Sequence, residues 1–257
     1  MSKNKEHEKE LSVASEVKTL TIPVNEKALQ DMLKPAPGTE EITAEDIVMP
    51  RIRLLQDQST EVKSKESASG KLKNSLTGET YDSIEFIPIA MHKSRIMFDI
   101  DNRNGSPLCR SNDVKIGSDG TRCPECDNAK WINNKPPLCN MIFNYLIIQP
   151  NEIGVMFIPS ILSFMKTSVQ SAMKLNMSVE CTIPRQPFWT KVWRVTPRIK
   201  PFKKGEAYIL DVQQVRDSTA DERSWAELIY KHTSSKKIDL TADEIQTGDL
   251  ATDDLTG

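Results

Sequence analysis

Short apolar runs, several of which alternate with polar residues, are separated by turn residues in the middle of the chain. These runs occupy residues 51–56, 84–91, 95–99, 141–148, 154–159 and 208–212. Alternation with a period of two is typical of β-strands, and short strands between turn signals favour an antiparallel barrel or sandwich. The fourth and fifth runs are close enough along the chain to pair as a hairpin. The predicted fold class is therefore mainly β, with some helix (α+β).

Apart from a short helix predicted over residues 25–33 with Asn25 as its cap, helical spacing of apolar residues is confined to two segments. Leu162, Val169 and other apolar residues recur at helical spacing within residues 160–177, whereas Lys166 lies off that face. This spacing predicts one main helix, because residues three or four apart lie on one helix face. A second, shorter helix is predicted over residues 221–231.

The two ends of the chain differ from its middle in composition and charge. Residues 1–46 carry a net charge of −4 and residues 239–257 one of −6, which leaves +8 on residues 47–238 because the whole chain carries −2. We therefore expect a largely disordered N-terminal segment, one folded domain and an acidic disordered tail. A basic domain favours a polyanionic partner such as nucleic acid, although ordinary solvated surface can also carry a charge of this size.

Residues 188–204 are the most basic and aromatic stretch, with six basic residues, four aromatic rings and no acidic residue. In a strand, Arg194 and Lys200 would share one face. Cations that follow phosphates and rings that stack on bases suit a single-stranded nucleic acid. The alternative places Trp189 and Trp193 in the core and the cations on a solvated face. With His92 beside them, the predicted contact residues are Lys93, Arg95, Lys166, Trp189, Lys191, Trp193, Arg194, Arg198, Lys200, Phe202, Lys203 and Lys204.

Four of the five cysteines fall within one polar segment, residues 102–140, in the spacing C-x13-C-x2-C-x12-C. Tetrahedral zinc accepts four thiolates, and a Cys-x-x-Cys turn supplies two of them. The segment is too poor in apolar residues to order itself, so the prediction is one structural zinc ion held by Cys109, Cys123, Cys126 and Cys139. Disulfides, redox chemistry and unliganded thiols are the alternatives. The fifth, Cys181, is expected to be a small core residue in a strand.

Other classes of protein find little support in the chain. No apolar run approaches the roughly 20 residues that a membrane-spanning helix needs. The first residues have no apolar core of a signal peptide, which favours the cytoplasm. A metal-dependent nuclease using Asp99 and Asp101 is an alternative, but no nucleophile–base set or phosphate-binding glycine loop accompanies them. We therefore predict that the protein is not an enzyme.

Several short segments carry a resemblance to a known class of proteins. These are residues 50–56 (PRIRLLQ), 74–79 (NSLTGE), 86–88 (FIP), 92–95 (HKSR) and 107–111 (PLCRS). Over residues 50–215 the chain resembles replication-associated proteins of tailed bacteriophages, in which a zinc-binding loop is inserted into an OB-like fold that binds single-stranded DNA.

The resemblance implies an OB-like antiparallel barrel with an inserted zinc ribbon and a helix across one end. The implied function is to coat and protect exposed single strands during phage DNA replication or recombination, without catalysis, in the host cytoplasm. Replication or recombination proteins are expected partners of the acidic tail. The alternative is a zinc-bearing interaction protein that binds a host polymerase or a replisome component.

Overall fold

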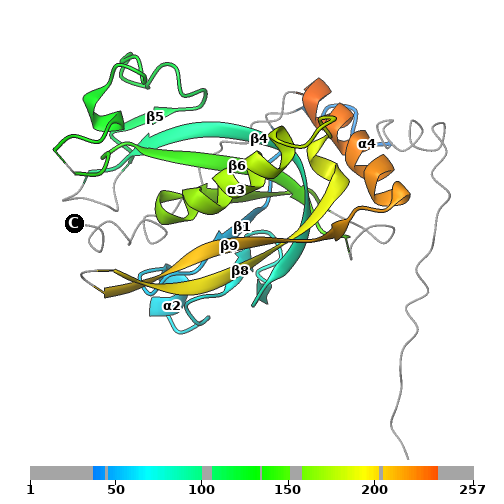
Figure 1. Cartoon of the computed structure of the whole chain (residues 1–257), viewed down its shortest axis with the longest axis horizontal. Helices are drawn as coiled ribbons and strands as arrows, with labels where there is room; N and C mark the ends of the chain where they lie inside the picture. The colour runs from blue at the N-terminus through cyan, green and yellow to red at the C-terminus, as the bar shows by residue number, and fades with distance from the viewer. Residues whose placement is uncertain are drawn as a thin grey trace, which may run out of the picture.

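The alternating segments form one curled, mixed β-sheet (Figure 1). The computed structural model describes residues 37–43, 46–99, 106–133, 135–150, 158–202 and 205–236. Within them, nine strands form one sheet in the order β3-β2-β1-β7-β6-β4-β8-β9, with β5 paired to β4. The strands are β1 (Arg51–Leu54), β2 (Leu72–Asn74), β3 (Thr80–Tyr81), β4 (Ile84–Met97), β5 (Cys109–Ser111), β6 (Asn140–Ile148), β7 (Ser160–Met165), β8 (Lys191–Phe202) and β9 (Gly205–Asp217). The prediction of a mainly β fold is confirmed.

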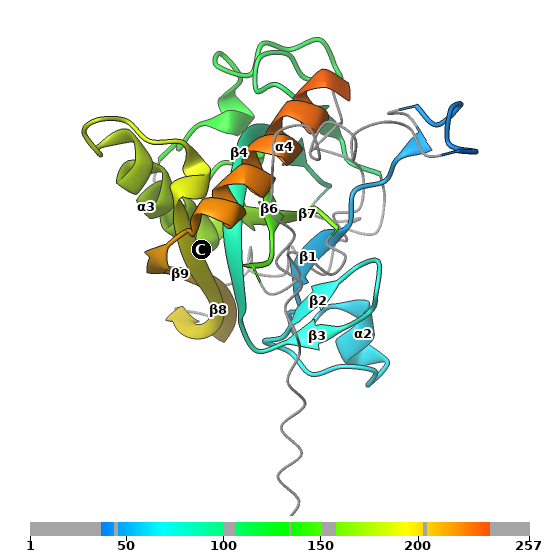
Figure 2. The same cartoon turned by 90° about the vertical axis from the view of Figure 1, so that its right-hand side faces the viewer.

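Helices pack on both faces of the sheet. The helical elements are α2 (Thr60–Lys63), α3 (Val169–Glu180), α4 (Ala220–Lys236) and the 3-10 turns η2 (Asp127–Ala129), η4 (Lys166–Ser168) and η5 (Phe188–Thr190). Helix α3 lies inside the curl, where Ala172 and Leu175 join the larger core cluster. Helix α4 crosses β4 on the opposite face, where Ala226 and Ile229 join a second cluster (Figure 2). The helix predicted over residues 221–231 is therefore confirmed as part of α4.

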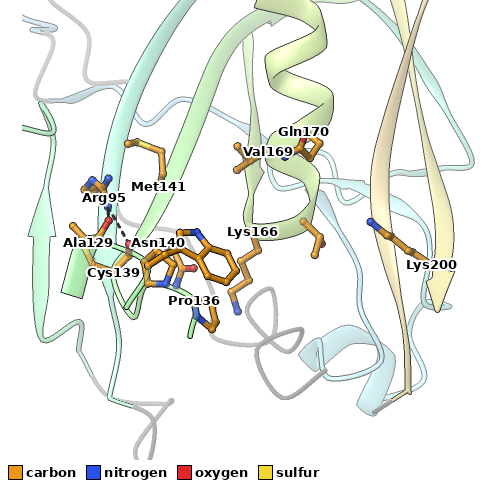
Figure 3. Close-up of a pocket in the computed structure, with 13 residues that line it drawn as sticks. Arg95, Ala129, Pro136, Cys139, Asn140, Met141, Lys166, Val169, Gln170 and Lys200 are labelled. Carbon is orange, nitrogen blue, oxygen red and sulfur yellow. Dashed lines mark hydrogen bonds between the residues drawn. The ribbon is translucent and has the colours of Figure 1, made fainter. Parts of the chain in front are cut away.

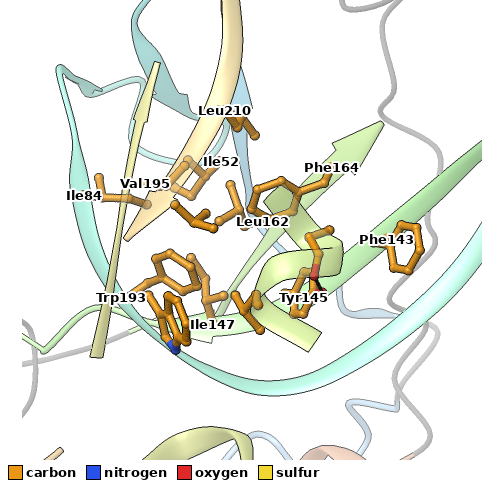
Figure 4. Packing of buried hydrophobic residues seen from close by; sticks show 14 of the residues in the cluster. Ile52, Ile84, Phe143, Tyr145, Ile147, Leu162, Phe164, Trp193, Val195 and Leu210 are labelled. Atoms are coloured by element: carbon orange, nitrogen blue, oxygen red, sulfur yellow. Dashed lines mark hydrogen bonds between the residues drawn. The ribbon is translucent and has the colours of Figure 1, made fainter. Parts of the chain in front are cut away.

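Strand β6 is apolar along most of its length because both of its faces are covered. Phe143, Tyr145 and Ile147 point into the cluster beneath α3 (Figure 4), whereas Leu146 and Ile148 point into the cluster beneath α4. A strand buried on both faces is expected to read as an almost continuous apolar run. The Tyr145 hydroxyl lies 3.2 Å from the Ala172 carbonyl and 2.7 Å from the Asn176 side-chain oxygen, which ties α3 to the sheet.

Strand β4 replaces two predicted strands, 84–91 and 95–99, with one strand of 14 residues. Its register with β6 shifts between Pro88 and Ala90. Such a bulge bends a strand and increases its twist. The bend lets the first residues of β4 pair with β8 while the remainder pairs with β6, so the sheet can curl.

The main helix predicted over residues 160–177 is wrong in its first part. Residues 160–165 form β7, which pairs antiparallel with β6 and parallel with β1, and helix α3 begins only at Val169. Ile161, Leu162 and Phe164 are all fully buried. A short apolar segment buried on both faces cannot be assigned to helix or strand from its spacing alone. The prediction that Cys181 is a core residue in a strand is also wrong, because Cys181 follows α3 and is exposed.

The sheet differs from an antiparallel barrel in two respects. The β1–β7 pair is parallel, which makes the sheet mixed. Within the described residues, its end strands β3 and β9 do not pair with each other. Gln56, just after β1, instead reaches β9, donating from Nε2 to the Tyr208 carbonyl (2.8 Å) and accepting from the Tyr208 N–H (3.1 Å). A side-chain amide thus links the two sides of the half-barrel.

Helix α4 begins with a reciprocal cap that also holds the end of β9. The Thr219 N–H donates to the Glu222 carboxylate (2.7 Å), and the Glu222 N–H donates to the Thr219 hydroxyl (3.2 Å). This arrangement is a capping box. Arg216 of β9 adds two hydrogen bonds to the same carboxylate, of 2.8 and 2.7 Å. Burial disfavours the ionised form of Glu222, but these donors outweigh it and lower its pKa below the ordinary value.

Replacing Glu222 by glutamine is expected to destabilise the protein by about 2 kcal/mol at pH 7, because a cap and a charge-assisted pair are both weakened. A lowered carboxyl pKa stabilises the fold above the unfolded-state pKa of about 4.3, and that contribution disappears as the pH falls through the folded-state pKa. Urea unfolding at pH 7 and pH 3.5 should therefore show a smaller difference between variant and wild type at the lower pH.

The matched control is Glu227→Gln on the same helix, where the carboxylate is half exposed and pairs with Lys231 at 2.8 Å. It should leave stability unchanged within error. Equal effects of the two substitutions would contradict a special role of Glu222.

Several predictions fall outside the described residues. They include most of the N-terminal segment, the acidic tail and residues 154–157 of the predicted strand 154–159. Within the described residues, no helix is long and apolar enough to cross a membrane.

Candidate nucleic-acid groove

Strands β8 and β9 form a ribbon that extends beyond the rest of the sheet. They pair with each other from Lys191 and Asp217 to Phe202 and Gly205. Strand β8 pairs with β4 only over residues 193–195, so the remainder of the hairpin is a two-stranded ribbon (Figure 1). The predicted basic segment therefore does form a strand. Its last two predicted contacts, Lys203 and Lys204, lie outside the described residues.

Three of the predicted cations on β8 are paired with carboxylates from neighbouring strands. The ion pairs are Lys191–Asp217 at 2.5 Å, Arg194–Glu85 at 2.6 Å and Arg198–Asp211 at 3.1 Å. Each carboxylate partly neutralises the field that its cation would present to a phosphate. The basic face of β8 is thus less positive than its sequence suggests.

The aromatic residues predicted to contact nucleic acid lie in different environments. Trp193 is 5% exposed and packs in the core with Ile84 and Val195 (Figure 4), so the prediction that it contacts bases is wrong. Its side chain points to the packed face of β8, where burial of the indole stabilises the fold. Trp189 is half-buried, with its ring centroid 5.2 Å from that of Tyr230 on α4. The Lys200 ammonium lies 5.6 Å from the Phe202 ring centroid.

A groove opens between the cysteine-rich insertion, the start of α3 and the ribbon (Figure 3). Its volume is about 530 Å³. The lining residues are Arg95, Ala129, Trp131, Pro136, Pro137, Cys139, Asn140, Met141, Lys166, Thr167, Val169, Gln170 and Lys200. Three of them are cations, and none of these described lining residues is acidic. A cavity of this size with converging polar groups is typical of a binding site.

Three predicted contact residues that are distant in sequence meet at this groove. Arg95 comes from β4, Lys166 from the turn η4 and Lys200 from the ribbon. Figure 3 shows the Lys200 side chain directed from the ribbon towards the start of α3. Among the described residues, Lys200 has no carboxylate partner. These side chains supply a positive field across the groove.

Lys166 has a backbone conformation that is rare for residues other than glycine. Its φ of 50° lies in the left-handed region, where a side chain costs of order 1 kcal/mol or more. The turn it forms joins β7 to α3 and is anchored to the ribbon, because the Leu210 N–H donates to the Ser168 hydroxyl at 3.0 Å. The backbone thus holds Lys166 at the groove at an energetic cost.

Trp131 is the groove residue that the sequence predictions missed. It is 69% exposed, whereas Trp193 is buried. A large aromatic ring inside a polar segment with no core of its own was the available signal, because such a ring has no local cluster to join.

Lys93 and His92, which were also predicted to contact nucleic acid, lie on β4 outside the groove. The Lys93 ammonium lies 5.2 Å from the Phe143 ring centroid. The His92 ring nitrogen Nε2 donates to the Asn112 carbonyl in the insertion. Neither residue lines the groove.

The four cysteines of the insertion lie in neighbouring loops. Cys109, Cys123 and Cys139 are buried and Cys126 is half-buried. The Cys126 N–H donates to the Cys123 carbonyl (3.3 Å), and the Cys139 N–H donates to the Asn128 carbonyl (2.8 Å), so Cys139 lies beside the Cys-x-x-Cys turn. Burial raises the pKa of the Cys139 thiol to about 11, with Arg95 opposing this and Cys109 and Cys123 adding to it.

The composition of the insertion and the placement of its four cysteines fit a metal site, but the cysteine side chains do not form a closed ligand shell. Within the described part of the chain, no three His, Cys, Asp or Glu side chains are grouped so that they could hold a metal ion. The insertion contributes β5 to the sheet and otherwise forms turns and two isolated bridges, Ile116–Arg122 and Ile132–Lys135. The zinc ion therefore stays a prediction, and so does the absence of catalysis. Asp101, from the nuclease alternative, lies outside the described residues.

Comparison with known proteins gives one match. A family model described as Pam3 phage gp34-like protein matches residues 18–239, which is most of the chain. No curated protein and no solved structure matches.

Proposed function

The chain belongs to the Pam3 phage gp34-like family, and from this premise we propose that it is a phage single-stranded-DNA-binding protein that acts without catalysis. The groove between the insertion, α3 and the ribbon is its binding site. The coating and protection of exposed strands during replication or recombination is the role that fits such a site.

The composition of the groove is the main support for this proposal. Arg95, Lys166 and Lys200 line it without an acidic residue among the described lining residues, and the exposed Trp131 ring stands at its wall. Cations and an exposed ring are what a flexible strand with accessible bases requires. The curled sheet also supports an OB-like relationship, because OB-type half-open barrels bind oligonucleotides across one face.

Fluorescence anisotropy of a labelled oligo-dT at several salt concentrations tests the proposal. Binding should be tight at 50 mM salt and weaken steeply towards 200 mM, because each neutralised phosphate releases counterions. Duplex DNA should bind more weakly, since its stacked bases cannot reach Trp131. Tighter binding of an RNA of the same length would change the assigned nucleic acid, and no binding at 50 mM salt would refute the proposal.

We also propose that Cys109, Cys123, Cys126 and Cys139 bind one structural zinc ion. Three of the thiols are already buried, and the backbone hydrogen bonds bring Cys139 to the Cys-x-x-Cys turn. Binding would displace the thiol protons and draw the sulfur atoms into a tetrahedral set. The metal would hold the loops of the insertion in place and take no part in a reaction.

An interaction protein is the second candidate function. Met173 and Met177 on α3 and the nearby Ile183 are 52%, 62% and 94% exposed. Exposed apolar residues of this kind are found at protein–protein contacts. Binding of a replication or polymerase partner that does not depend on salt, together with no affinity for oligonucleotides, would favour this candidate. Recruitment of replication or recombination proteins through the acidic tail, residues 239–257, stays a prediction.

A further inference from the structure

We propose that the groove is a subsite for one unstacked base of the bound strand, with Trp131 as the stacking residue. This inference rests on the proposed function and specifies how that site recognises its ligand. It goes beyond electrostatic coating, because it requires the base itself and not only the phosphates.

The first argument is the position of Trp131. Its ring is 69% exposed, yet it lines a hollow together with Pro136 and Pro137 of the same loop. An isolated exposed indole on a flat surface would have no such surroundings. Here the ring forms one wall of a volume of about 530 Å³, which lies within the range of pockets for small molecules and is too small for a duplex.

The second argument is that the loop carrying Trp131 is held in place. The Arg95 guanidinium donates from Nη1 to the Cys139 carbonyl at 3.1 Å and to the Ala129 carbonyl at 3.5 Å (Figure 3). Ala129 precedes Trp131 and Cys139 follows it, so one side chain joins both ends of the loop. A ring that is positioned before binding loses less entropy when it stacks on a ligand.

The third argument is the distribution of polar groups around the hollow. Lys166 and Lys200 can meet phosphates, whereas Asn140 and Gln170 each offer both donors and acceptors, as a base edge requires. A peptide could also stack on a tryptophan, but the described lining residues include three cations and no acidic residue, which favours an anionic ligand. A nucleotide satisfies the ring, the amides and the cations together.

The test is a double-mutant cycle between Trp131 and the bases. Wild type and Trp131→Ala are each measured by anisotropy against an oligo-dT of about 12 nucleotides and against a fully abasic strand of the same length. Wild type should bind oligo-dT about 10-fold more tightly than the abasic strand. Trp131→Ala should lose that preference and bind the abasic strand as wild type does.

Trp131→Phe is the matched control, because it keeps a stacking ring and should retain most of the preference for oligo-dT. Free dTMP should compete only weakly, since a mononucleotide lacks the neighbouring phosphates. Equal weakening of both strands by Trp131→Ala, or no weakening of either, would overturn the base subsite while leaving the proposed function in place. No binding of either strand by wild type would overturn both.

Discussion

Replacing Cys126 by serine is expected to lower the bound zinc from one ion per chain to almost none. Serine is a poor zinc ligand, and the three remaining thiols cannot complete a tetrahedral shell. Structural zinc binding contributes about 10–16 kcal/mol in small zinc-binding peptides, which makes this the largest effect predicted for the protein. Metal content measured by mass spectrometry on protein purified without chelators gives the result directly.

The loss of metal should act on the insertion before it acts on the sheet. Strand β5 is paired antiparallel with β4, whereas the loops from Cys123 to Cys139 are connected mainly by turns. Hydrogen exchange should therefore rise across these loops in Cys126→Ser, while β6 and β7 stay protected. Binding of oligo-dT should weaken as well, because Trp131 lies within the loosened segment.

Cys181→Ser is the matched control, since Cys181 is the exposed cysteine at the end of α3. It should keep a full complement of zinc. Stoichiometric zinc in Cys126→Ser, or wild-type protein purified with no metal under reducing conditions, would show that the four cysteines do not form the proposed site.

Neutralising Lys166 and Lys200 together is expected to weaken single-strand binding by about 100-fold at 50 mM salt. For a single strand, each phosphate contact contributes about 0.7 to the magnitude of the slope of log K against log salt, which corresponds to roughly tenfold per lysine when extrapolated from 1 M to 50 mM. Lys166→Gln/Lys200→Gln should therefore also reduce the magnitude of that slope by about 1.4. Anisotropy titrations at four or more salt concentrations measure both quantities.

The control for this pair carries the same change of charge at the other end of the molecule. Lys191, at the start of β8, pairs with Asp217, and Lys231 on α4 pairs with Glu227. Figure 1 shows α4 far from β5 and the insertion. Lys191→Gln/Lys231→Gln should leave the slope almost unchanged. Equal losses in the two double variants would mean that binding follows net charge and that the groove has no special role.

Arg95 connects the two parts of the proposed site. It lines the groove, and it donates hydrogen bonds to backbone carbonyls on both sides of Trp131. Because its guanidinium is already engaged with the insertion, we assign it a positioning role more than a phosphate contact. The insertion, the cations and the stacking ring therefore act as one unit.

The sequence alone determined the kind of structure and which segments of the chain stand out in composition. Period-two alternation correctly predicted β1, β8 and part of β9, because a half-buried strand alternates, whereas β7 was predicted as a helix. Most of the run 188–204 was correctly predicted to be a strand, since β8 spans Lys191–Phe202, and the polar segment with four cysteines was recognised from spacing and composition. These features depend on residues that are close together in the chain.

Only the tertiary structure decided which of those residues are available for binding. Arg194 is paired with Glu85, which is more than 100 residues away, and no local pattern could reveal that partner. Trp193 lies in the core because β8 pairs with β4 in the register that places Trp193 opposite Phe86. A shift of that register by one residue would turn the same side chain to the other face of the sheet. Lys166, Lys200 and Trp131 meet at one groove because the sheet curls, and curvature is a property of long-range pairing that short sequence windows do not contain.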